Sequence, residues 1–139
     1  MTDWARPALT VDVALLAQSP QPSILLVERA HDPFAGSWAL PGGFVEEDER
    51  VADAAARELA EETGVQAPEL SLLDVYDTPG RDPRGWTVSV TFLGRIGERV
   101  EVHAADDASD AAWFPLERLP RLAFDHATIV ADAVSRLSS

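Results

Sequence analysis

The chain has 139 residues and a formal net charge of −13, and its length suits one domain spanning 1–139 with a single hydrophobic core. It contains no cysteine, and its 11 basic residues are all arginine, which excludes disulfides, thiolate metal sites, cysteine nucleophiles and lysine Schiff bases. The acidity argues against a nucleic-acid partner, and without a secretory leader or an apolar run of about 18 residues we expect a cytoplasmic protein with no membrane partner.

The first third of the chain predicts short strands separated by turns. Apolar and polar residues alternate over 9–17, which is typical of a half-buried strand, and 24–27 reads as its neighbour. A short apolar piece at 38–40 then runs into Pro41-Gly42-Gly43, where we expect the chain to turn sharply.

The segment 50–63 predicts a helix that lies close to a sheet. Small apolar residues recur at helical spacing: Ala52, Ala55, Ala56 and Leu59. Asp48 or a neighbour is expected to cap the start of this helix, and Gly64 stands where a C-terminal cap belongs.

The remaining sequence predicts three further strands and a closing helix. The segments 70–76 and 86–96 are rich in β-forming residues, and the loop 77–85 between them is too polar to be core. A strand near 112–114 precedes a helix opened by Asp125, whose apolar stripe is Ile129, Val130, Ala133, Val134 and Leu137. The predicted fold class is α/β or α+β, with helices on both sides of a mixed sheet.

Acidic residues concentrate around the predicted helix 50–63. Eight of them fall between Glu46 and Glu62, against two arginines, for a local charge of −6. Glu58, Glu61 and Glu62 share one helix face, where like charges repel one another. A solvated acidic surface is one interpretation. The other is a site for a hard cation with oxygen ligands, Mg²⁺ or Mn²⁺.

The residues 43–65 resemble the Nudix box, G-x5-E-x7-R-E-U-x-E-E-x-G-U, in which U is a bulky aliphatic residue. Nine specified positions are filled in register: Gly43, Glu49, Arg57, Glu58, Leu59, Glu61, Glu62, Gly64 and Val65. The resemblance implies an α/β/α sandwich with a mixed sheet. It also implies Mg²⁺-dependent hydrolysis of the diphosphate of a nucleoside diphosphate linked to another moiety.

The same resemblance implies the metal ligands. Glu58 and Glu62 would be the principal ligands, Glu61 a further ligand or a holder of water, and the carbonyl of Gly42 an additional ligand. Such families often draw one more carboxylate from outside the box. Of Asp106, Asp107 and Asp110 we favour Asp107, with a solvated acidic loop as the alternative.

Two further roles follow for residues of the box. Arg57 and Glu49 would pair and orient the helix. A glutamate of this helix, directly or through a hydroxide on the metal, would be the general base, because carboxylates can accept the proton of an activated water.

The loop 77–86 carries two arginines, Arg81 and Arg84, that we expect to meet the substrate, because their spacing suits a phosphate or a carboxylate with planar donors. Local pairing of Arg84 with Asp82 is the alternative. The stretch R-D-P-R-G, together with L-A-F-D-H at 122–126, resembles the ADP-ribose pyrophosphatase branch and related ADP-ribose sensors. The expected reaction is therefore cleavage of ADP-ribose to AMP and ribose 5-phosphate.

Four aromatic residues are candidates to stack on the base or line the pocket, with a place in the core as the alternative: Trp38, Phe44, Trp86 and Phe124. His31, His103 and His126 receive no role, because their spacing is not that of metal ligands. Two other functions stay open, a nucleoside triphosphate pyrophosphohydrolase and a non-hydrolytic ADP-ribose sensor. The resemblance also implies a homodimer.

Overall fold

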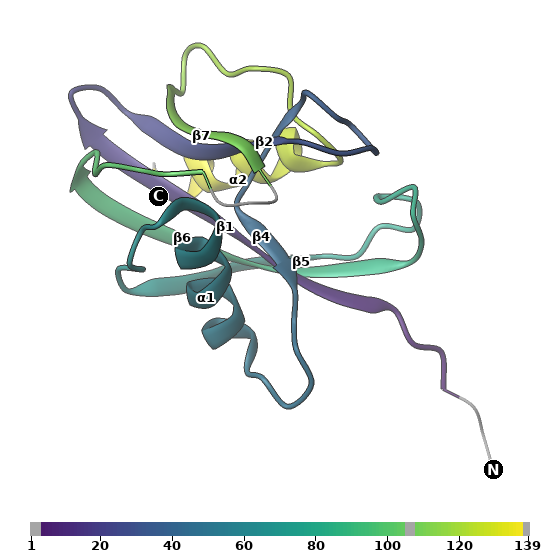
Figure 1. Cartoon of the computed structure of the whole chain (residues 1–139). Helices are drawn as coiled ribbons and strands as arrows, with labels where there is room; N and C mark the ends of the chain where they lie inside the picture. The colour runs from purple at the N-terminus through teal and green to yellow at the C-terminus, as the bar shows by residue number, and fades with distance from the viewer. Residues whose placement is uncertain (1–3, 105–107, 138–139) are drawn as a thin grey trace.

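The computed structural model describes residues 4–104 and 108–137, which fold into the seven strands and two helices of Figure 1. In chain order they are β1 (Ala8–Ser19), β2 (Ser23–Arg29), β3 (Trp38–Ala39), β4 (Gly42–Phe44), α1 (Val51–Thr63), β5 (Leu70–Tyr76), β6 (Thr87–Glu98), β7 (Ala108–Pro115) and α2 (His126–Leu137). Neither helix in these ranges is long and apolar enough to cross a membrane.

The strands form one mixed sheet in the order β3-β2-β1-β6-β5, in which β4 also pairs with β1 and β7 with β2. The long strands β1 and β6 run parallel, from Ala8 opposite Thr87 to Ser19 opposite Glu98. The other pairs are antiparallel. This confirms the predicted mixed sheet.

Strand β1 is buried on both faces. Val11, Val13 and Leu15 pack on the side of α1, whereas Ala14 and Leu16 pack on the side of α2. The half-buried strand predicted from the alternation is therefore wrong, because a helix covers each face of the sheet and removes both from water. The two helices lie on opposite sides of the sheet (Figure 1), which confirms the predicted α/β/α sandwich.

Helix α1 ends as predicted but begins differently. Gly64 has the left-handed φ of 75° that a C-terminal cap requires, and its N–H donates to the carbonyl of Ala60. At the start, Arg50 occupies the cap position and makes no side-chain cap hydrogen bond, so the side-chain cap predicted at Asp48 or a neighbour is absent. Asp48 instead adopts a φ of 63° in the turn before the helix.

The sharp turn predicted at Pro41-Gly42-Gly43 is confirmed at Pro41, but the two glycines belong to a strand. The chain bends only at Pro41, and Gly42 to Phe44 form β4, paired with Thr10 to Asp12 of β1. Neither Gly42 nor Gly43 has a positive φ. A Cβ atom on Gly42 would lie 2.1 Å from the carbonyl oxygen of Val11, so close contact with β1 is what requires glycine there.

Candidate active site

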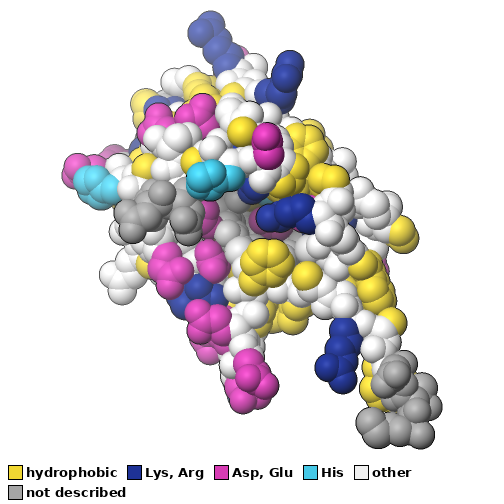
Figure 2. Space-filling model, turned by 45° about the vertical axis from the view of Figure 1, so that its right-hand side comes forward, with side chains coloured by type: hydrophobic (Ala, Val, Ile, Leu, Met, Phe, Trp, Pro, Cys, Tyr) yellow, Lys and Arg dark blue, Asp and Glu magenta, His cyan; other side chains and the backbone are white. Residues whose placement is uncertain are grey.

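A cleft of about 870 Å³ opens between the acidic face of α1 and the loop 77–86. Its walls come from β1, β2, β4, α1, that loop and the segment before α2. Figure 2 shows acidic side chains gathered beside a hollow that also has arginine and hydrophobic side chains at its rim. The sheet thus brings together segments that are far apart in the sequence.

Arg57 holds the acidic wall together. Its Nε and Nη2 donate to the two oxygens of Glu49, at 2.7 and 2.9 Å. Its Nη1 donates to Glu58 at 2.8 Å and to Glu61 at 3.2 Å, and Nη2 also donates to the carbonyl of Phe44. The hydrogen bonds from Arg57 lower the pKa of Glu49 to about 2. The structure therefore contains the Arg57–Glu49 pair that the resemblance implied.

Glu62 is bound by the backbone and not by Arg57. Its Oε1 accepts a hydrogen bond from the N–H of Gly42, at 2.7 Å. Burial raises its pKa to about 8, and the negative charge of Glu58 adds to that rise. Burial raises the pKa of Glu58 as well. Two adjacent carboxyl groups are thus held where their joint ionisation is costly.

Gly43 leaves the space that Glu58 occupies. A Cβ atom at this position would lie 2.6 Å from the carboxyl carbon of Glu58, so any larger residue would displace that side chain. The glycine at the start of the motif therefore allows α1 to place a carboxylate directly against β4.

The donors at this wall suit a hard divalent cation. Within 4–104 and 108–137, no three acidic or histidine side chains are arranged to enclose a metal ion. Mg²⁺ does not need such a cage, because it is commonly bound by one or two carboxylates and completed by water and substrate phosphates. Glu58 and Glu62 offer two carboxylates at the cleft, and a bound cation would favour their ionised forms against the burial and the neighbouring negative charges that raise their pKa values.

Both arginines of the loop 77–86 already have carboxylate partners. Arg81 makes two hydrogen bonds to Asp125, at 2.8 and 2.7 Å, and Arg84 makes two to Asp82, at 3.1 and 2.8 Å. The Arg81 side chain is 5% exposed and Asp82 is buried. The expectation that this loop is too polar to be core fails for these two residues, because ion pairs accompany their burial.

Two of the four candidate aromatic residues line the cleft. Phe124 lies close to two guanidinium groups, with that of Arg29 at 4.9 Å and that of Arg84 at 5.5 Å from its ring centre. Phe44 lies 5.8 Å from the guanidinium of Arg84. The structure places the other two away from the cleft wall: Trp38 packs against Phe114 in the core, and Trp86 is half exposed.

Arg29 was not predicted as a site residue. It lines the cleft at the end of β2, and its Nε donates to the carbonyl of Pro33. Among the described residues it forms no salt bridge, and burial lowers its pKa. Only its position after an apolar strand could have indicated it.

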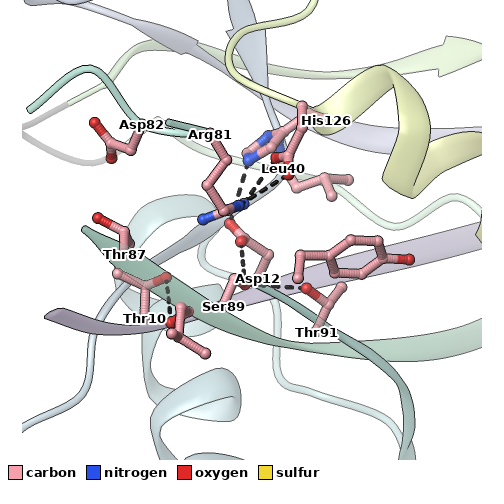
Figure 3. A network of polar contacts seen from close by, with 12 residues as sticks. Thr10, Asp12, Leu40, Arg81, Asp82, Thr87, Ser89, Thr91 and His126 are labelled. Atoms are coloured by element: carbon pink, nitrogen blue, oxygen red, sulfur yellow. Dashed lines mark hydrogen bonds and ion pairs between the residues drawn. The ribbon is translucent and has the colours of Figure 1, made fainter. Parts of the chain in front are cut away.

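Asp12 and His126 were missed as well. Figure 3 shows both in a buried polar network at the base of the cleft. Asp12 accepts a hydrogen bond from Ser89, and its Oδ1 lies 3.7 Å from Nε2 of His126. Burial raises the pKa of Asp12 and lowers that of His126. A single acidic residue within an apolar strand was the available sequence signal for Asp12.

The carboxylate predicted from outside the box is not placed by the structure. Asp107, and Asp106 beside it, lie outside the described residues. Asp110 is exposed on β7, where its carboxylate accepts a hydrogen bond from the N–H of Ala111.

The NUDIX domain family matches residues 6–133. Over 93% of its length the chain is 47% identical to an ADP-ribose pyrophosphatase of Methanocaldococcus jannaschii, of which it covers 74%. It is 35% identical, over 99% of its length, to the ADPR responsive transcriptional repressor NtrR of Acinetobacter baylyi.

A solved structure of a NUDIX domain is also similar to this chain. The NUDIX domain of Shewanella oneidensis NrtR, complexed with ADP ribose, superposes with a TM-score of 0.89 and 36% identity, covering 96% of this chain and 90% of that one. The chain spans only 57% of the length of the Acinetobacter repressor. The filled motif, the α/β/α fold and the extent of these matches establish that the chain belongs to the NUDIX family.

Proposed function

We propose that this protein is a Mg²⁺-dependent pyrophosphohydrolase that cleaves ADP-ribose to AMP and ribose 5-phosphate. One observation carries the proposal: a single cleft has paired carboxylates on one wall and, on the other, a guanidinium that lies beside an aromatic ring and forms no salt bridge within 4–104 and 108–137. The likeness to the archaeal ADP-ribose pyrophosphatase supports this choice of substrate.

Glu58 and Glu62 would hold the cation, with Glu61 and the carbonyl of Gly42 as further ligands. Mn²⁺ satisfies the same oxygen donors. When bound, a divalent cation neutralises charge on the diphosphate and lowers the pKa of water. A glutamate of α1 then accepts the proton of the attacking water, and Arg57 keeps the neighbouring carboxylates in position.

The opposite wall would bind the phosphates and the base. Arg29 can turn its N–H groups to a phosphate without breaking a salt bridge to any described residue, whereas Arg81 and Arg84 would each have to release an aspartate. Phe124 and Phe44 offer apolar surfaces at the same cleft for the adenine. In this proposal Arg29 binds the phosphates, which is the role that the sequence suggested for Arg81 and Arg84.

Product analysis tests the proposal. The protein is incubated with Mg²⁺ or Mn²⁺ and ADP-ribose, and parallel samples receive other nucleotide sugars and oxidised nucleoside triphosphates. We expect AMP and ribose 5-phosphate from ADP-ribose, with Glu58→Gln and Glu62→Gln each slower by roughly 100-fold or more. Release of pyrophosphate from triphosphates, with ADP-ribose left intact, would instead indicate a triphosphate pyrophosphohydrolase.

A non-hydrolytic ADP-ribose sensor is the second candidate. The match to an ADPR responsive repressor over nearly the whole chain favours it. If the protein is a sensor, calorimetry should detect binding of ADP-ribose, and no substrate should be hydrolysed with either Mg²⁺ or Mn²⁺. The intact set of carboxylates in the motif argues for hydrolysis, because a sensor does not need them.

We also propose that this single domain acts in the cytoplasm on a small nucleotide and forms a homodimer. Leu72 and Val75 of the edge strand β5 are exposed, which supports association of two copies along this edge. Light scattering on the purified protein measures the state directly.

A further inference from the structure

The side chain of His126 is buried where α2 begins, and it contacts the backbone that leads into β4. Its Nδ1 accepts a hydrogen bond from the N–H of Leu40, at 3.0 Å. We infer that His126 is a positioning residue, which fixes the backbone from Leu40 to Gly42 and thereby places the Gly42 N–H that holds Glu62. This inference rests on the proposed function only in treating Glu62 as a metal ligand.

The path from His126 to Glu62 is short. Leu40 and Gly42 are separated by one residue, Pro41, whose ring restricts its backbone. The N–H of Leu40 is fixed by His126, and the N–H of Gly42 donates to Glu62 at 2.7 Å. A shift of Leu40 therefore changes the position of the donor that orients the Glu62 carboxylate.

The opposite side of this segment is held by β1. Val13 donates its N–H to the carbonyl of Pro41 at 2.8 Å, and Asp12 pairs with Gly42 across the two strands. Asp12 is itself held by a hydrogen bond from Ser89. With β1 fixed in the centre of the sheet, His126 is the contact from α2 that completes the clamp around Leu40 to Gly42.

The hydrogen bond from Leu40 requires one tautomer of the neutral His126 ring. Burial lowers the pKa of His126, so its ring is neutral and has one acceptor nitrogen and one donor nitrogen. Because Nδ1 accepts from Leu40, the proton is on Nε2, which faces the Asp12 carboxylate at 3.7 Å. Figure 3 shows His126, Leu40 and Asp12 grouped in this way.

Two substitutions of His126 test whether the acceptor at Nδ1, and not the imidazole ring as a whole, is what matters. Asparagine can present an acceptor near the place of Nδ1, whereas glutamine places its amide near that of Nε2 and leaves the Leu40 N–H without a partner. Ile129→Val is the matched control, because it trims a buried side chain on the same helix and leaves the Leu40 contact intact. All three are made in the full chain.

The first readout is the chemical shift of the Gly42 amide proton in a ¹H–¹⁵N spectrum of the metal-free protein. Glu62→Gln gives the reference value of that shift when the amide has no carboxylate acceptor. The second is Mn²⁺ affinity from electron paramagnetic resonance. We expect His126→Gln to move the Gly42 signal toward that of Glu62→Gln and to weaken Mn²⁺ binding by roughly 10- to 100-fold. His126→Asn should stay close to the wild type in both.

An unchanged Gly42 signal in His126→Gln would overturn the inference. So would an equal change in Ile129→Val, because the effect would then follow from lost packing. If the wild-type protein hydrolyses no nucleotide, the proposed function fails, but the metal-free Gly42 signal still decides the role of His126.

Discussion

Arg29 is a single side chain that the sequence did not indicate: the arginines predicted to meet substrate are paired, whereas Arg29 forms no salt bridge with any residue that the structure describes. Replacing a charge-assisted hydrogen bond to phosphate costs about 1.5–3 kcal/mol. We therefore expect Arg29→Gln to raise KM for ADP-ribose roughly 10-fold or more, with a smaller effect on kcat. Arg118→Gln, at an exposed position, is the control in steady-state kinetics. Equal KM values in the two variants would contradict this assignment.

Glu62 makes the stability of the metal-free protein depend on pH. Its pKa is about 8 in the folded state, against 4.5 for an ordinary glutamate. Between these values the unfolded chain binds fewer protons than the folded one, so the free energy of unfolding falls as pH rises through this window. Urea denaturation should show that fall in the wild type and a weaker one in Glu62→Gln. Parallel pH profiles would show that Glu62 ionises normally.

At the scale of elements, the site depends on how closely β4 approaches α1. Gly43→Ala places a methyl group against Glu58, whose flexible side chain can move aside. We expect activity to fall about as far as in Glu58→Gln, with little change in Tm. Gly97→Ala on β6 is the matched control, because a Cβ there meets nothing within 4 Å. Full activity in Gly43→Ala, measured as AMP release, would show that Glu58 tolerates displacement.

For the whole molecule, the net charge of −13 implies self-repulsion in the folded state. Screening lengths fall from about 10 Å at 0.1 M salt to about 3 Å at 1 M. We expect the Tm of the metal-free protein to rise with sodium chloride, because repulsion between the acidic groups outweighs the few exposed ion pairs. Differential scanning calorimetry over that range measures it, and a falling Tm would mean that the arginine pairs dominate.

The sequence by itself determined the elements that local patterns control. The helix with its C-terminal cap at Gly64, the long strands and the register of the carboxylates on α1 follow from hydrophobic period and motif spacing, which act within one segment. The mixed α/β/α sandwich followed from the same patterns together with the family resemblance.

Only the tertiary structure decided which groups meet at the cleft. Arg29, Asp12 and His126 come from three elements, and their partners lie up to 86 residues away in the chain. Burial and pairing depend on such distant contacts, and no local pattern records them. The same reason explains why the predicted turn is confined to Pro41 while Gly42 and Gly43 form part of β4. Glycine is required there by the close approach of β1 and Glu58, and not by a left-handed backbone angle.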